Sequence, residues 1–163
     1  MKNGKNIILA LLTILIINIF SACTNRQLML EAERLQILNF IQKSKLDFDT
    51  LPSGVLLHVD TSYDSIPIRQ DDQVLLVYTG YNLDDNEKIF VKDDSVYFYV
   101  NDPYLLNGWR DIILTVPNKT YGTAIFPYYT AYNKKRIASV APYSTLVFDF
   151  YVEKYEPYRH SKK

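Results

Sequence analysis

One helix-like segment stands among segments whose other strong signals are those of β-strands. Between residues 102 and 116 the apolar residues recur at the spacing of one helix face, and they are Leu105, Leu106, Trp109, Ile112, Ile113 and Val116. Either Asp102 before Pro103 opens this helix, or Asn107 caps a shorter one after an extended lead-in. A Pro-Asn pair then ends it. We therefore expect a sheet folded around one helix, with Trp109, the only tryptophan, where the two meet.

Strand signals lie on both sides of this helix. They cover residues 55–59, 73–81, 95–100, 121–126 and 145–155. The last segment alternates best, because Leu146, Phe148 and Phe150 share one face while Asp149 lies on the other. One helix among many strands, without alternating strand–helix units, predicts an α+β fold with an antiparallel sheet. Residues 27–46 precede this region and are predicted to form a separate helix.

The first 22 residues resemble an export signal more than a part of the fold. Lys2 and Lys5 precede an apolar run that continues to Phe20, and the small residues Ser and Ala then lead to Cys23. Cys23 is the only cysteine and lies where a bacterial lipoprotein signal has its lipid acceptor. The alternatives are a transmembrane anchor, for which the run is short, or an ordinary signal peptide. We expect an acylated (for example palmitate-carrying) lipoprotein of the bacterial envelope that is anchored in a membrane and faces the periplasm.

The remaining 141 residues suit one domain and a tether. The predicted organisation is a signal peptide at 1–22, a tether and helix at 23–49, a domain at 50–156 and a basic tail at 157–163. Removing Lys2 and Lys5 from the 18 basic residues leaves 16 against 18 acidic ones, a balance that does not indicate nucleic acid as a partner. A single cysteine allows no disulfide within the chain, so its stability must come from core packing.

The chemistry-bearing residues favour no common type of active site. His58 lies in a strand and His160 in the basic tail, so no zinc-type cluster remains once Cys23 is acylated, and a catalytic triad would have to use His58. Only five glycines are present, and none of them forms a phosphate loop. Aspartate pairs at 84–85 and 93–94 suggest calcium or glycoside chemistry, but their turn-like surroundings favour solvated loops. We expect no metal and no cofactor; the distinctive feature is aromatic, with 14 tyrosines and 8 phenylalanines.

The order of the segments resembles that of the FKBP-type peptidyl-prolyl isomerases. Residues 50–55 (TLPSGV) look like the family's entry strand, and residues 72–80 (DQVLLVYTG) look like its V-x-V-x-Y-x-G strand. Residues 105–109 (LLNGW) are similar to V-I-x-G-W, residues 127–133 to P-x-x-A-Y-G, and residues 142–149 (PYSTLVFD) to the closing P-x-x-T-L-V-F strand. A helix before such a domain also resembles FKBP-like lipoproteins of the bacterial envelope, including those associated with gliding motility. The implied fold is an antiparallel half-barrel around one short helix.

The resemblance implies an apolar pocket that binds a prolyl residue. Trp109 would be its floor, and the walls implied by position are Tyr78, Phe90, Val91, Leu105, Leu106, Tyr132 and Phe148, with Val96 and Val140 matched less closely. The alternative is that all of these are core residues. No nucleophile or metal is required, because the barrier of about 18–20 kcal/mol comes from amide resonance. A dry aromatic cavity that favours the twisted amide lowers that barrier.

Three departures from the family bear on activity. The family has aspartate after the phenylalanine that matches Phe90, whereas this chain has Val91. The glycine after the pocket tyrosine is Asn133, and a Lys-Lys-Arg run follows it. A D-G turn before Phe90 is replaced by Asp-Asn-Glu. These changes leave the fold prediction intact and weaken the prediction of isomerase activity, so no catalytic residue is assigned.

We therefore expect an envelope lipoprotein whose FKBP-like domain binds proline-containing or unfolded envelope proteins, as an isomerase or a chaperone. One alternative is a non-catalytic interaction module of an envelope assembly, which the valine at position 91 favours. The other is a glycan-binding lipoprotein, suggested by the closely spaced Tyr128, Tyr129 and Tyr132.

Overall fold

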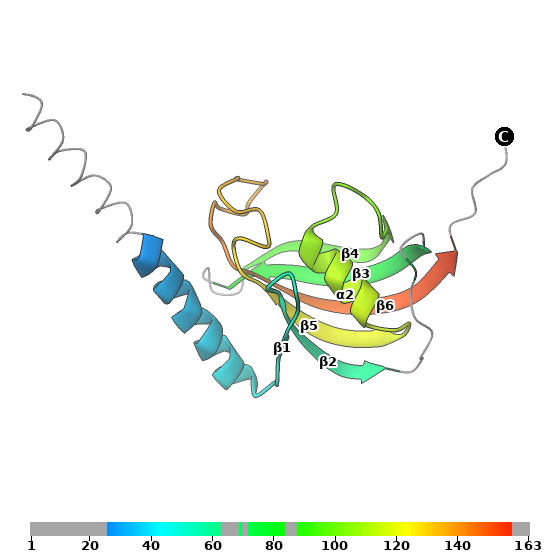
Figure 1. The fold of residues 1–163 in the computed structure, drawn as a ribbon, viewed down its shortest axis with the longest axis horizontal. Helices are drawn as coiled ribbons and strands as arrows, with labels where there is room; N and C mark the ends of the chain where they lie inside the picture. Colours follow the sequence, from blue (N-terminus) through cyan, green and yellow to red (C-terminus); the bar gives the residue numbers. More distant parts are fainter. Residues whose placement is uncertain (1–25, 63–68, 70–71, 84–87, 158–163) are drawn as a thin grey trace, which may run out of the picture. The chain divides into compact units, whose positions relative to one another are not determined.

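A computed structural model describes residues 26–62, 69, 72–83 and 88–157 of the chain. The predicted signal peptide, Cys23, the aspartate pair at 84–85 and residues 158–163 lie outside the described residues. The chain divides into two compact units, Met1–Leu38 and Asn39–Lys163. The helix predicted at 27–46 is present at 26–44 and is the blue helix of Figure 1.

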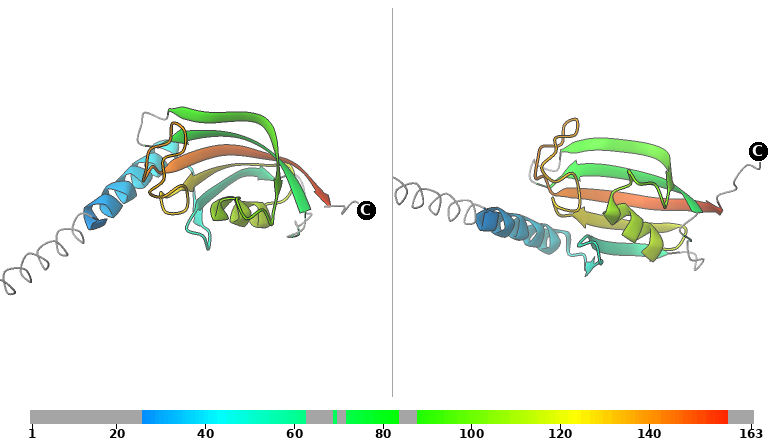
Figure 2. Two further views of the ribbon diagram at one scale, coloured as in Figure 1. Left: turned by 90° about the horizontal axis from the view of Figure 1, so that it is seen from above. Right: turned by 45° about the horizontal axis from the view of Figure 1, so that its top comes forward.

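The second unit is built on one antiparallel sheet of six strands in the order β1-β2-β5-β6-β3-β4. The strands are β1 (Asp49–Thr50), β2 (Leu56–Ser62), β3 (Asp72–Asn82), β4 (Ile89–Tyr99), β5 (Thr120–Phe126) and β6 (Leu146–Pro157). The single helix between β4 and β5 is α2 (Asn107–Thr115), and the sheet curves around it (Figures 1 and 2). The predicted α+β half-barrel around one short helix is therefore confirmed. Each predicted strand is present, and only the two-residue β1 was not predicted.

The prediction of a loop at residues 93–94 is wrong, because β4 begins at Ile89 and continues through both aspartates. Tyr78 of β3 is paired with Asp93, and the register shifts between Leu76 and Tyr78. β4 is an edge of the sheet. An edge strand tolerates polar and charged residues that a central strand excludes, and so its sequence does not look like that of a strand.

Helix α2 starts later than Asp102, and its N-cap is Leu106 rather than Asn107. Asp102 forms a turn instead, because its carboxylate Oδ1 accepts the backbone N–H of Tyr104 at 2.8 Å and its carbonyl accepts that of Leu105 at 3.1 Å. An aspartate that binds the N–H two residues later favours a turn over a helix. Residues 103–105 therefore lie in a turn and a bend, and only Leu106 directly before the helix is extended, so neither sequence alternative is met in full.

The core lies between the inner face of the sheet and α2. On β6 the inner face consists of Leu146, Phe148, Phe150 and Val152, all of which are buried, as their alternation predicted. Gly108 allows the helix to approach β5 and the entry segment, since an added Cβ would meet the ring of Phe126 and a methyl group of Val55. This close contact brings Trp109, in the first turn of α2, against the central strands.

Candidate functional site

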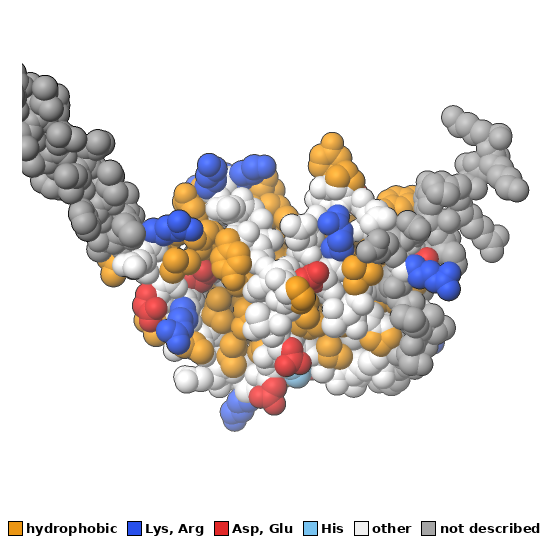
Figure 3. Space-filling model, viewed as in Figure 1, with side chains coloured by type: hydrophobic (Ala, Val, Ile, Leu, Met, Phe, Trp, Pro, Cys, Tyr) orange, Lys and Arg blue, Asp and Glu red, His pale blue; other side chains and the backbone are white. Residues whose placement is uncertain are grey.

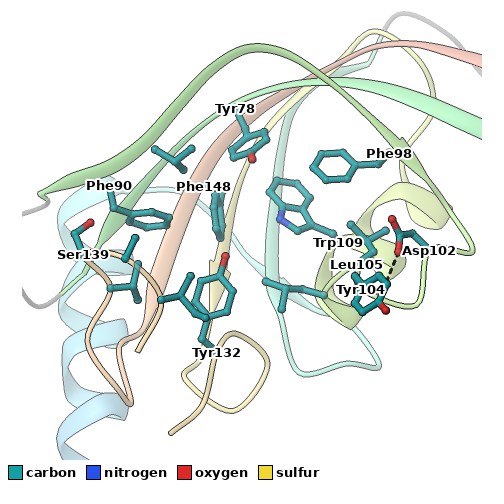
Figure 4. Close-up of a pocket in the computed structure, with 15 residues that line it drawn as sticks. Tyr78, Phe90, Phe98, Asp102, Tyr104, Leu105, Trp109, Tyr132, Ser139 and Phe148 are labelled. Carbon is teal, nitrogen blue, oxygen red and sulfur yellow. Dashed lines mark hydrogen bonds between the residues drawn. The ribbon is translucent and has the colours of Figure 1, made fainter. Parts of the chain in front are cut away.

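A cavity of about 460 Å³ opens between the N-terminal end of α2, the sheet and the loop that joins β5 to β6 (Figure 4). Its lining comes from every one of these elements: Tyr78, Phe90, Val91, Phe98, Asp102, Tyr104, Leu105, Leu106, Trp109, Tyr132, Ile137, Ala138, Ser139, Val140 and Phe148. This volume is within the range of small-ligand pockets in proteins. Most of the lining side chains are apolar or aromatic.

Trp109 forms part of both the cavity wall and the core. It is only 4% exposed, and its ring is surrounded at centroid distances of 5.0–6.5 Å by Phe148, Phe126, Tyr78, Phe150 and Phe98. Mixed tilted, edge-on and stacked contacts of this kind hold an aromatic ring in one orientation. The two sequence alternatives for Trp109, pocket floor and core residue, therefore apply together.

One wall of the cavity depends on the glycine at position 80 of β3. Gly80 is paired with Val91 on one side and with Phe148 on the other. A Cβ at this position would lie 2.7 Å from Phe148, 2.8 Å from Phe90 and 2.8 Å from Val91. The three wall side chains thus occupy the space that any larger residue at position 80 would need, and Phe90 and Phe148 meet edge to face at 5.8 Å.

The opposite wall is Tyr132, which a tight turn places at the mouth of the cavity. The backbone N–H groups of Thr130 and Ala131 both donate to the carbonyl of Pro127, and that of Asn133 donates to the carbonyl of Tyr128. Asn133 has φ 55°, a left-handed conformation. Asparagine adopts it more readily than other residues with a side chain. The asparagine that replaces the family's glycine is therefore compatible with the turn.

The Tyr132 hydroxyl is the polar group best placed to meet a ligand. It points into the cavity in Figure 4, and none of the hydrogen bonds among the described residues uses it. Burial raises the pKa of the Tyr132 hydroxyl above its usual value of 10.0. The group therefore stays protonated at neutral pH and can donate to a carbonyl.

Val91 leaves the sheet side of the cavity without a carboxylate. It is half-buried and lines the cavity beside Phe90. Asp102 is the single carboxylate among the lining residues, and it lies at the α2 end, where its Oδ1 already accepts the N–H of Tyr104. The aspartate expected from the family therefore has no substitute on the same wall.

All eight pocket residues predicted from the sequence line this one cavity. Of the two less closely matched positions, Val140 lines it and Val96 does not. The sequence reasoning missed Phe98, Asp102, Tyr104, Ile137, Ala138 and Ser139. Their positions in the sequence could have indicated some of them as lining residues. Asp102 and Tyr104 lie just before the matched leucine pair, and residues 137–139 directly follow the basic run.

The three tyrosines proposed as a glycan platform do not share a surface. Tyr128 is only 7% exposed and packs edge-on against Tyr129 and Tyr143 at centroid distances of 5.7 and 5.5 Å. Tyr132 lines the cavity, whereas Tyr129 is exposed. A sugar-binding platform needs exposed aromatic faces on one side, and this arrangement does not provide it.

Comparison of the structure with solved structures finds peptidyl-prolyl isomerase folds. FkpA from Escherichia coli aligns with a TM-score of 0.65 and 20% identity over 78% of this chain and 61% of FkpA. A peptidyl-prolyl cis-trans isomerase from Pseudomonas syringae aligns with a TM-score of 0.66 and 21% identity over 79% of this chain and 94% of that enzyme. This chain therefore spans less than two thirds of FkpA. No protein-family model and no curated protein matches the sequence.

These similarities establish an FKBP-like fold of divergent sequence. No helix among the described residues is both long and apolar enough to cross a membrane. No group of three or more His, Cys, Asp or Glu side chains within the same residues is placed to hold a metal ion.

Proposed function

We propose that this chain binds proline-containing or apolar peptide segments in the cavity over Trp109, with a role as a peptidyl-prolyl isomerase or as a chaperone. The observation that carries the proposal is the cavity itself. It combines an aromatic floor, a protonated tyrosine hydroxyl at its mouth and an FKBP-like fold around it.

The chemistry of such a site follows from the prolyl amide. Twisting the amide removes its resonance, which costs about 18–20 kcal/mol in water. An apolar cavity holds the proline ring without water, and the Tyr132 O–H can donate to a carbonyl of the bound segment. Only interactions that are stronger for the twisted amide than for the planar one accelerate the reaction.

The cavity is suited to a segment longer than one residue. A second cavity of about 370 Å³ adjoins the first and shares Tyr104, Leu105 and Leu106 with it. Its lining also includes polar side chains from Ser53, Asn107 and Thr130. Residues next to a bound proline therefore have a place to lie.

Valine at position 91 predicts weak isomerase activity. It therefore supports a second candidate function, that of a non-catalytic interaction module. A valine accepts no hydrogen bond, so this wall cannot orient a polar group around the amide. Binding of the ground state without additional binding of the transition state gives little rate acceleration. We expect peptide binding with isomerase activity far below that of family members that keep the aspartate.

Titration of a short Ala-Pro peptide, followed by Trp109 fluorescence and by an isomerase assay, tests the proposal. Binding with weak or absent isomerisation is the expected result. Binding with strong isomerisation would remove the role assigned to Val91. A Trp109 signal that does not change, together with no binding by calorimetry, would leave the cavity as a packing defect of the core and would end the proposal.

We further propose that Cys23 is acylated and anchors the domain to an envelope membrane. The proposal is supported by the basic residues, apolar run and Ser-Ala-Cys sequence of the first 23 residues. Mass spectrometry of the purified protein, with or without a lipid on the N-terminal cysteine, tests it.

A further inference from the structure

Three consecutive cations lie beside the mouth of the cavity. Lys134, Lys135 and Arg136 are all exposed on the β5–β6 loop, and the next three residues line the cavity. Figure 3 shows basic side chains at the tip of this loop, next to a notch that separates it from the connection between β4 and α2. Within the described ranges, no carboxylate forms an ion pair with any of the three.

The backbone of this loop is fixed at both ends of the basic run. At its start, the N–H of Lys135 donates to the carbonyl of Tyr132 at 3.0 Å. After it, Ile137 and Val140 exchange two backbone hydrogen bonds of 3.2 and 2.8 Å across a tight turn. Because Tyr132, Ile137 and Val140 also line the cavity, the three cations are held next to it.

The charge around the cavity is therefore unequal. The β5–β6 loop carries the three cations, whereas Asp102 lies at the α2 end of the lining. Arg110 is held at the α2 end, because its Nε donates to the carbonyl of Val100 and its Nη2 to that of Asp102, so this end carries one acidic and one basic side chain. An acidic group on a bound segment is therefore attracted to the loop end of the cavity more than to the α2 end.

We propose that the basic run selects proline-containing segments that carry acidic residues on one side of the proline. This inference rests on the proposed function and names its client class. A segment in extended conformation advances about 3.3–3.6 Å per residue, so acidic residues two to four positions from the proline can reach the loop. The interaction is exposed and therefore screened by salt, over a Debye length of about 8 Å at physiological ionic strength.

An acidic peptide fits the observations better than an anionic lipid surface or a nucleic acid. Recognition of anionic lipids uses clusters of about four to eight basic residues, more than the three on this loop. The position of the cations beside a cavity with an apolar lining matches a ligand that has both apolar and acidic parts.

The experiment compares four peptides that share one Ala-Pro centre. One is neutral, one has two glutamates before the proline, one has two glutamates after it, and one has two lysines in place of the glutamates. Binding is measured by calorimetry at low and at physiological salt. We expect one of the two acidic peptides to bind about three- to tenfold more tightly than the neutral one at low salt, because exposed ion pairs each contribute little.

The matched variants are the triple change Lys134→Gln, Lys135→Gln and Arg136→Gln and the single change Lys119→Gln. Lys119 is an exposed cation between α2 and β5, outside the cavity lining. The triple variant should lose the preference for the acidic peptide and keep its affinity for the neutral one. Lys119→Gln should keep both.

Acidic peptides that bind no better than the neutral peptide, or a preference that survives in the triple variant, would refute the inference while leaving the proposed function intact. Failure of all four peptides to bind would overturn both. A third outcome is that the unmodified protein shows no preference among the peptides but binds phosphatidylserine vesicles, and that the triple variant does not bind them. This outcome would refute the inference and assign the loop to a lipid surface instead.

Discussion

Replacing Gly80 by alanine tests how the cavity wall is built. The added Cβ would lie 2.7–2.8 Å from Phe148, Phe90 and Val91, whereas ordinary contact begins near 3.4 Å. Each of the three side chains must therefore retreat by about 0.6–0.7 Å, and such overpacking costs about 1–3 kcal/mol of folding free energy. The lower entropy of the unfolded chain offsets about 0.4–1 kcal/mol of this. We expect a net loss of about 1–2 kcal/mol in the free energy of unfolding.

The same displacement should weaken peptide binding more than the loss of stability explains. All three displaced side chains line the cavity. A misfit of one methylene in an apolar pocket changes the binding free energy by about 1–3 kcal/mol, which lowers the affinity about tenfold or more. Ile113→Val is the matched control, because Ile113 is fully buried outside the cavity lining and the change costs about 0.5–1.5 kcal/mol. Urea denaturation gives both stabilities, and calorimetry gives both affinities. Equal peptide affinity in Gly80→Ala and Ile113→Val would refute this account of the wall.

Four further expectations follow from the site and the signal. Trp109→Ala should lower the free energy of unfolding by about 3–5 kcal/mol in urea denaturation, because the ring is buried among five others; a loss below 1 kcal/mol would contradict its place in the core. Tyr132→Phe should weaken peptide binding by about 0.5–1.5 kcal/mol with little change in stability, and because burial raises the pKa of Tyr132, wild-type affinity should not fall between about pH 7 and pH 9 through loss of its proton. Val91→Asp should raise isomerase activity if it folds; an unchanged rate in a peptide-binding variant would show that this position does not limit catalysis. Cys23→Ser should move the protein from the membrane fraction to the soluble fraction or leave an uncleaved precursor, and normal processing with retained membrane binding would exclude the lipid anchor.

The pocket residues could be predicted because the motifs that carry them are local. In the segment at 105–109, the two leucines and Trp109 are positioned by a few residues of lead-in and one turn of helix. On β6, strict alternation assigned Phe148 to the inner face before any partner strand was known. The resemblance then ordered these motifs around one cavity, and the structure brings them together there.

Two other features depended on hydrogen bonds that the hydrophobic pattern does not reveal. β4 is a strand through residues 93–94 because β3 pairs with it at the edge of the sheet, where polar residues are tolerated. The late start of α2 follows from the hydrogen bonds of the Asp102 carboxylate and carbonyl, which form a turn. Neither result is visible in local hydrophobic periodicity.

Periodicity and short motifs, which act within a few residues, were enough to predict most of the helices and strands, the inner face of β6 and the aromatic character of the pocket. Packing between distant segments places Trp109 in the core and the cavity wall at once, and it brings the side chains of Phe90, Val91 and Phe148 into the space beside Gly80. It also placed the run from Lys134 to Arg136 beside the cavity. These relations arise when β6 inserts between β5 and β3 and the helix closes against the sheet, since packing joins residues that no local pattern connects.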